Sequence, residues 1–146
     1  MKINWLWDKN YPKEELGVTL HPVNEKLTNK LQSLFTKTVE LEVIQPVNER
    51  RFKIDSQMIF MIEAMDQLSK VYTNDDQVFY LKGRLKDFTD LQAVQLFRIN
   101  NSVILNLAQV TSFKNGQYAR LEVFTKNGQT FSVSRHYAKQ IKEALQ

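Results

Sequence analysis

The sequence contains no cysteine among its 146 residues, and only four glycines, three prolines and two histidines. Without thiols it has no disulfide framework, no thiolate nucleophile and no cysteine-ligated zinc. No apolar run reaches the roughly 18 to 20 residues that span a bilayer, and charges come too early for a signal-peptide core. Because 42% of the residues are hydrophobic, the chain can bury a core, and we expect a soluble cytoplasmic protein stabilised by packing.

Catalytic motifs are also lacking. The chain has no Gly-x-Ser-x-Gly sequence, no glycine-rich phosphate-binding loop and no spaced cluster of His or Asp that would hold a metal. The acidic pairs Glu14-Glu15 and Asp75-Asp76 lie in turn-like surroundings, although distant carboxylates could still converge in space. We therefore expect a protein that is not an enzyme and that uses no cofactor.

Positive charge is concentrated in the last third of the chain. Residues 94–146 hold seven basic and two acidic residues, whereas residues 1–43 balance six lysines against six acidic residues. The whole chain has a pI of about 9.3. A basic end attracts phosphates, but many basic proteins bind no particular anion, so this feature indicates nucleic acid only weakly.

Residues 1–45 are expected to form a small strand-helix-strand unit ahead of the main domain. Apolar and polar residues alternate, as they do in short strands, at residues 2–7, 18–20 and 39–43. An amphipathic helix is expected from about Asn24 to about Thr36. Trp5 and Trp7 are expected to pack, as aromatics on short terminal strands usually do. This unit is a candidate dimerisation or regulatory element.

Residues 46–146 have the pattern of an antiparallel β domain, so the fold class is mainly β and α+β overall. The polar run 74–76 predicts one hairpin turn, and Asn-Gly at 115–116 and 127–128 supplies left-handed residues for two more. A short helix at 83–91 and a final helix with Tyr137, Ile141 and Leu145 on one stripe complete the pattern. The expected strands of this domain are 51–54, 57–63, 69–73, 77–81, 96–99, 103–105, 110–113, 117–124 and 129–133.

Several motifs then occur in order along this domain. They are Ile62-Glu63-Ala64, the run FRINNSVILNL at 97–107, Asn127-Gly128 and the run SVSRHY at 132–137. Together they resemble the LytTR family of bacterial DNA-binding domains, over about residues 45–146. The resemblance implies an elongated antiparallel fold of about ten strands with short helices, whose loops enter successive major grooves of double-stranded DNA. Promoter direct repeats or paired half-sites are the implied target.

The resemblance also implies a set of DNA contacts. It places one group on a loop after residue 97, another at the start of the last helix, and a third in the loop after Ile62-Glu63-Ala64. Arginine can read guanine and asparagine can read adenine, while lysine neutralises phosphate. The implied contacts are Arg98, Asn100, Asn101, Ser102, Arg135, His136, Ser69, Lys70 and Lys139.

Other interpretations of these residues stay open at this point. Arg98 and Arg135 are compatible with ordinary solvated charges, and Ser134 is first of all a helix N-cap. The basic residues at 82, 84 and 86 are interpreted as a solvated face of the middle helix.

Asn100-Asn101 is where the chain departs from the family pattern. Many members carry His or Ser followed by Arg or Lys at this place, so one positive charge is missing. Lower affinity for DNA or a different base preference would follow. The alternative function is a protein-interaction module, or anti-activator, with weak or lost DNA binding.

Response regulators of the family also carry a receiver domain, which residues 1–45 are too few to form. The chain therefore resembles stand-alone members, some of which have a membrane-protein partner, and a homodimer would suit paired half-sites.

Overall fold

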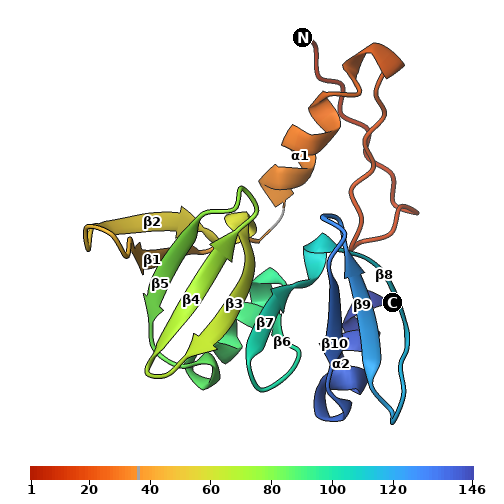
Figure 1. Ribbon diagram of the computed structural model, residues 1–146. Helices are drawn as coiled ribbons and strands as arrows, with labels where there is room; N and C mark the ends of the chain where they lie inside the picture. Colours follow the sequence, from red (N-terminus) through yellow and green to blue (C-terminus); the bar gives the residue numbers. More distant parts are fainter. Residues whose placement is uncertain (36) are drawn as a thin grey trace. The chain divides into compact units, whose positions relative to one another are not determined.

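The computed structural model describes residues 1–35 and 37–146 and divides the chain into two compact units, Met1–Thr36 and Lys37–Gln146 (Figure 1). This division precedes the boundary expected near residue 45, because the strand Glu40–Ile44 (β1) pairs with later strands. Among the described residues, none of the helices combines the length and the apolar character needed to cross a membrane.

The first unit contains the 3-10 helix Pro22–Asn24 (η1) and the α-helix Leu27–Phe35 (α1). The end expected at about Thr36 lies outside the described residues. The strands predicted at 2–7 and 18–20 are wrong, because neither segment pairs with another strand, and alternation alone does not stabilise an unpaired strand. The packing predicted for Trp5 and Trp7 is also wrong, since they are 72% and 92% exposed.

The second unit confirms the predicted mainly antiparallel β fold, with ten strands among its residues. Seven strands form one sheet in the order β2-β1-β5-β4-β3-β7-β6, and three form another in the order β10-β9-β8. After β1, the strands are Arg51–Asp55 (β2), Ile59–Met65 (β3), Leu68–Thr73 (β4), Val78–Lys82 (β5), Leu96–Arg98 (β6), Val103–Asn106 (β7), Val110–Asn115 (β8), Leu121–Thr125 (β9) and Thr130–Val133 (β10).

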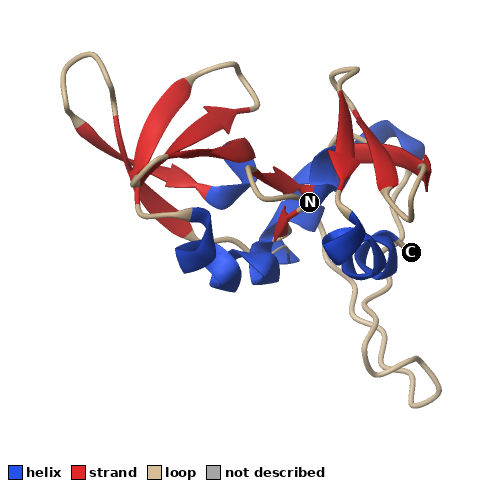
Figure 2. Cartoon of the chain, turned by 60° about the horizontal axis from the view of Figure 1, so that its bottom comes forward, coloured by secondary structure: helices blue, strands red, loops and turns tan. Residues whose placement is uncertain are grey.

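Helical segments connect or cover these strands. The 3-10 helices Ser56–Met58 (η2) and Leu107–Gln109 (η4) lead into β3 and β8. The 3-10 helix Leu85–Val94 (η3) packs on the core of the seven-stranded sheet, and the α-helix Arg135–Leu145 (α2) packs on the three-stranded sheet (Figure 2). The predicted middle and final helices are therefore confirmed. The stripe of the final helix packs in the core, where Ile141 is fully buried.

One arrangement of elements occurs twice in the second unit. The order β1-β2-η2-β3-β4-β5-η3 recurs as β6-β7-η4-β8-β9-β10-α2, with corresponding antiparallel strand pairs. Asp55 and Asn106 cap η2 and η4 in the same way, each through a side-chain oxygen. We call residues 40–94 the first repeat and residues 96–145 the second repeat. Elements at equivalent places in the two repeats can therefore be compared directly.

The hairpin turns show where sequence chemistry and structure agree and differ. The turn after Thr73 forms as predicted, and Gly128 has the left-handed conformation predicted for its Asn-Gly pair, with φ 80°. Gly116 does not, because β8 continues through Asn115 and the left-handed residues come later in the loop. For the same reason β9 begins at Leu121 and not at the predicted residue 117.

Candidate nucleic-acid interface

The β6–β7 loop, residues 99–102, is held in shape by two of its predicted contact residues. The Arg98 guanidinium donates from Nε to the Asn100 carbonyl oxygen at 3.2 Å and from Nη2 to the Asn101 carbonyl oxygen at 3.0 Å. The Asn100 Oδ1 accepts from the Ser102 amide at 2.8 Å, which is an Asx turn. Much of the hydrogen-bonding capacity of the Arg98 and Asn100 side chains is therefore already satisfied by the backbone of the loop.

Further hydrogen bonds join this loop to the start of α2. Asn100 Nδ2 donates to the Ser132 carbonyl oxygen at 3.2 Å, and the Ser134 amide donates to the Ile99 carbonyl oxygen at 2.9 Å. The other side of the loop is tied to β3, where the Ala64 amide donates to the Ser102 carbonyl oxygen at 2.8 Å. The structure thus brings the β6–β7 loop and the first residues of α2 together, although they are more than thirty positions apart in the chain.

Asn101 and Arg135 are two predicted residues whose side chains remain available at this place. Both are exposed, and neither side chain has a hydrogen bond or ion pair with any described residue. Ser134 stands at the N-cap position as predicted, but its hydroxyl makes no capping hydrogen bond. An amide and a guanidinium therefore project from adjoining backbone segments that are themselves fixed.

The remaining predicted residues of this group lie nearby. Ser102 is exposed at the end of the loop, and Lys139 is exposed one helical turn after Arg135. His136 is also exposed, and its ring packs edge-on against Tyr137 with the centroids 4.8 Å apart.

Ser69 and Lys70 are not in a loop, which corrects their predicted placement. Both belong to β4, because the turn after β3 consists of residues 66–67 alone. Ser69 is fully buried, and its hydroxyl donates to the Gly83 carbonyl oxygen at 2.8 Å, so it has no exposed atom to offer a ligand. Lys70 lies with Nζ 5.3 Å from the Tyr72 ring centroid, and the neighbouring Tyr72 raises the pKa of this ammonium. Lys70 is therefore cationic at neutral pH.

Sequence reasoning missed two cations at this surface. A recess of about 240 Å³ places Arg84 and Lys86, at the start of η3, beside Arg98 and Asn101. The spacing of the basic residues indicated a solvated helix face. No local pattern in the sequence predicts that this helix lies near the β6–β7 loop. Strand pairing relates them, because β3 pairs with β4 on one side and with β7 on the other. Asp66 also lines the recess.

Comparison with known proteins identifies the family. Residues 49–146 match the model of the LytTr DNA-binding domain. The chain belongs to the LytTR DNA-binding domain family. No curated protein matches it. Among solved structures it is similar to the LytTr DNA-binding domain of a Bacillus cereus protein described as a methyl-accepting/DNA response regulator, with a TM-score of 0.60, 19% identity, and coverage of 74% of this chain and 95% of that chain. At that identity the likeness supports the fold alone.

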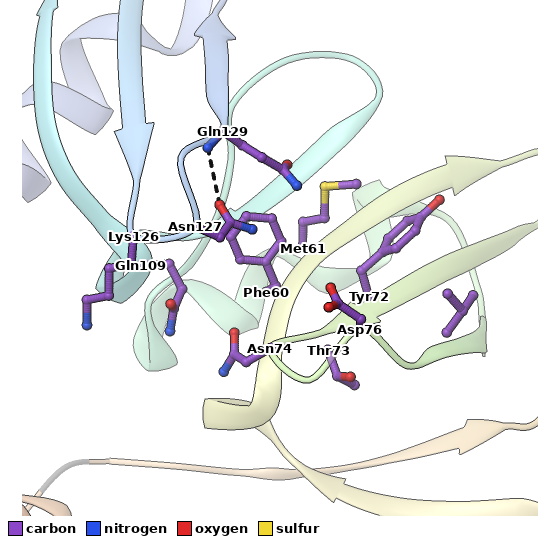
Figure 3. A pocket seen from close by; sticks show the side chains of 11 residues that line it. Phe60, Met61, Tyr72, Thr73, Asn74, Asp76, Gln109, Lys126, Asn127 and Gln129 are labelled. Carbon is purple, nitrogen blue, oxygen red and sulfur yellow. Dashed lines mark hydrogen bonds between the residues drawn. The ribbon is translucent and has the colours of Figure 1, made fainter.

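A larger recess of this LytTR domain lies away from the loop and α2 start (Figure 3). Its volume is about 530 Å³, and it is lined by the β4–β5 and β9–β10 turns, with Phe60 and Met61 between them. The β9–β10 turn is at the opposite end of β10 from Arg135. Of the residues that the structure describes, no three His, Asp or Glu side chains are grouped to hold a metal. None of the residues predicted to contact DNA lines this recess.

Proposed function

We propose that this LytTR protein is a sequence-specific transcriptional regulator that inserts loops into the major groove of double-stranded DNA. The observation that carries the proposal is that some polar residues of the interface stabilise the loop, whereas others leave their side chains available to a ligand. Arg98 and Asn100 hold the loop, whereas Asn101 and Arg135 are exposed and keep their side-chain groups free. Because the backbone of both segments is already fixed, the ordering cost of binding is limited to the rotamer freedom of the two side chains.

The chemistry of these two side chains suits base reading. An asparagine amide can pair with adenine N6 and N7, and an arginine fork can pair with guanine O6 and N7 in the major groove. Lys139 follows Arg135 by one helical turn, and we expect its ammonium to neutralise a phosphate. Arg84 and Lys86 supply positive charge beside Asn101, where the loop lacks the cation that many LytTR members carry.

A homodimer on direct repeats or paired half-sites accords with this function. The first unit exposes Trp5 and Trp7 and the helix residues Leu34 and Phe35, each at 71% or more of its surface. We propose that these side chains contact a second subunit or a membrane-protein regulator. Light scattering of the protein on its duplex distinguishes two copies from one.

The test of this function is binding to DNA duplexes from the promoter region upstream of the protein's own gene. Fluorescence anisotropy measures the affinity over a range of salt concentrations. We expect log affinity to fall steeply with log salt. Asn101→Ala should change the ranking of half-site sequences, and Lys139→Ala should weaken all duplexes alike. Lys53→Ala, on the edge strand β2, is the matched control for lost charge.

Two results would count against base reading by this surface. Equal losses on all sequences for Asn101→Ala and Lys139→Ala would contradict direct readout by Asn101. Absence of binding at low salt, with Arg135→Ala no different from the unaltered protein, would favour the protein-interaction module instead.

A further inference from the structure

The β8–β9 loop, residues 116–120, is a tight hairpin connection that exposes a tyrosine side chain. Tyr118 and Ala119 are consecutive non-glycine residues in the left-handed region, with φ 55° and 61°. They are the two central residues of a type I′ hairpin turn, which requires positive φ at both positions, although a bulky residue such as tyrosine is disfavoured there. The loop is closed by two backbone hydrogen bonds, from Gly116 to Arg120 at 2.9 Å and from Arg120 to Gln117 at 3.1 Å. This conformation holds the Tyr118 ring out in solvent, 81% exposed.

The loop lies at the same end of the three-stranded sheet as the start of α2. Leu121, the first residue of β9, pairs with Asn115 at the end of β8 and with Val133 at the end of β10. Helix α2 begins two residues after Val133. A recess of about 270 Å³ separates the loop from α2 and is lined from both sides, by Asn115, Gly116, Ala119, Arg120, Leu121, Ala138, Lys139 and Lys142.

The charge around this recess is positive. Arg120, Lys139 and Lys142 all line it, and no acidic residue does. On the other side of the loop a recess of about 480 Å³ contains Glu122, but that carboxylate pairs with Lys114 at 3.5 Å. The Arg120 guanidinium has no hydrogen bond or ion pair with any residue in the described part of the chain. An anion approaching this loop therefore meets three cations without a competing carboxylate in the recess.

The internal repeat shows what the loop corresponds to. In the first repeat the equivalent connection is the β3–β4 turn, residues 66–67, which borders the recess shared with Arg98 and Asn101. In the second repeat the connection is longer, and it borders Lys139 of α2. Each of these strand connections thus borders a residue proposed to contact DNA, Asn101 in the first repeat and Lys139 in the second.

We propose that the β8–β9 loop is a further DNA contact, which binds the sugar–phosphate backbone next to the groove entered by Arg135. Arg120 binds a phosphate together with Lys139 and Lys142, and Tyr118 lies against the backbone and donates its hydroxyl hydrogen bond to a neighbouring phosphate. The inference rests on the proposed DNA-binding function. Because phosphates are the same in every sequence, the contact adds affinity without changing base preference.

The full chain and a duplex that it binds provide the test, with Arg120→Gln and Tyr118→Asn as the variants. Asparagine tolerates the left-handed region, so the second variant removes the ring and keeps the loop backbone. Losing one phosphate contact should weaken binding about eightfold at about 0.1 M salt and reduce the slope of log affinity against log salt by about 0.9. Tyr118→Asn should weaken binding with the salt slope unchanged. Both variants should shorten the hydroxyl-radical footprint at one end and leave the ranking of half-sites unaltered.

Lys53→Gln, on β2, is the control with the same change of charge. If Arg120→Gln matches this control in affinity, salt slope and footprint, the loop contact is refuted while the DNA-binding function stands. A changed half-site ranking for Arg120→Gln would also overturn backbone binding, because it would indicate base reading. If the unaltered protein binds no duplex at all, both this contact and the proposed function fail.

Discussion

Replacing Arg98 with lysine separates two roles that a basic residue at a DNA interface can have. The substitution keeps one positive charge at the end of β6. It removes the guanidinium that donates to the Asn100 and Asn101 carbonyl oxygens at 3.2 and 3.0 Å. A lysine ammonium is a point donor on a flexible stem and does not reproduce this fork. The loop that presents Asn101 should therefore lose its fixed shape.

The size of the effect follows from these two hydrogen bonds. Hydrogen bonds from charged donors contribute about 1.5 to 3 kcal/mol each when buried. Arg98 is only partly buried, so about 1 to 2 kcal/mol for the pair is appropriate. Binding must then restore the loop shape at that cost, which corresponds to a loss of affinity of about five- to thirtyfold.

Fluorescence anisotropy over a salt series measures this loss, and Arg98→Gln completes the comparison. If Arg98 acts by holding the loop, Arg98→Lys should weaken binding by the stated amount with an unchanged salt slope. If it acts as a phosphate contact, Arg98→Lys should retain most of the affinity, and Arg98→Gln alone should reduce the slope by about 0.9. Binding of Arg98→Lys within twofold of the unaltered protein would refute the loop-holding role.

Two predictions concern stability, measured by far-UV circular dichroism in denaturant. Asn106 is 2% exposed, donates to the Ile59 carbonyl oxygen at 2.8 Å and accepts from the Ala108 amide at 3.0 Å. Asn106→Ala should therefore lower the free energy of unfolding by about 2 to 4 kcal/mol. The control Asn101→Ala should change it by less than about 0.5 kcal/mol. A similarly small effect of Asn106→Ala would contradict a stabilising role for the two buried hydrogen bonds of Asn106. The two Asn-Gly pairs supply a matched test, because Gly128 has φ 80° and Gly116 lies outside the left-handed region. Gly128→Ala should cost about 1 kcal/mol or more and Gly116→Ala much less, and equal costs would show that the turn conformation is not the cause.

Local patterns predicted much of the β domain. Alternation located nearly every strand of the second unit within a few residues, because side chains of a half-buried strand alternate between core and solvent. The same rule failed at residues 2–7 and 18–20, which have no partner strand among the described residues. The Asn-Gly turn prediction failed at Gly116, because an Asn-Gly pair favours a tight turn only where the strands end beside it, and β8 runs to Asn115.

At the proposed interface, the sequence likewise predicted where the contact segments lie but not which of their side chains are available. The resemblance to a family located the loop and the start of α2, but residue type alone did not separate the roles of neighbouring asparagines. The side-chain amide of Asn100 forms hydrogen bonds with the backbone of Ser102 and Ser132, while that of Asn101 has no hydrogen bond with any described residue. Ser69 has a polar side chain that the fold buries against Gly83.

The sequence by itself determined the absence of thiol chemistry, the basic C-terminal third and the mainly antiparallel fold, because these depend on composition and on periods of two to four residues. Only the tertiary structure decided which polar groups remain available to a ligand. It joined Ile99 to Ser134 and placed Arg84 beside Asn101. The physical reason is that a side chain's role depends on which hydrogen bonds its neighbours have already satisfied, and strand pairing brings in those neighbours from distant parts of the chain.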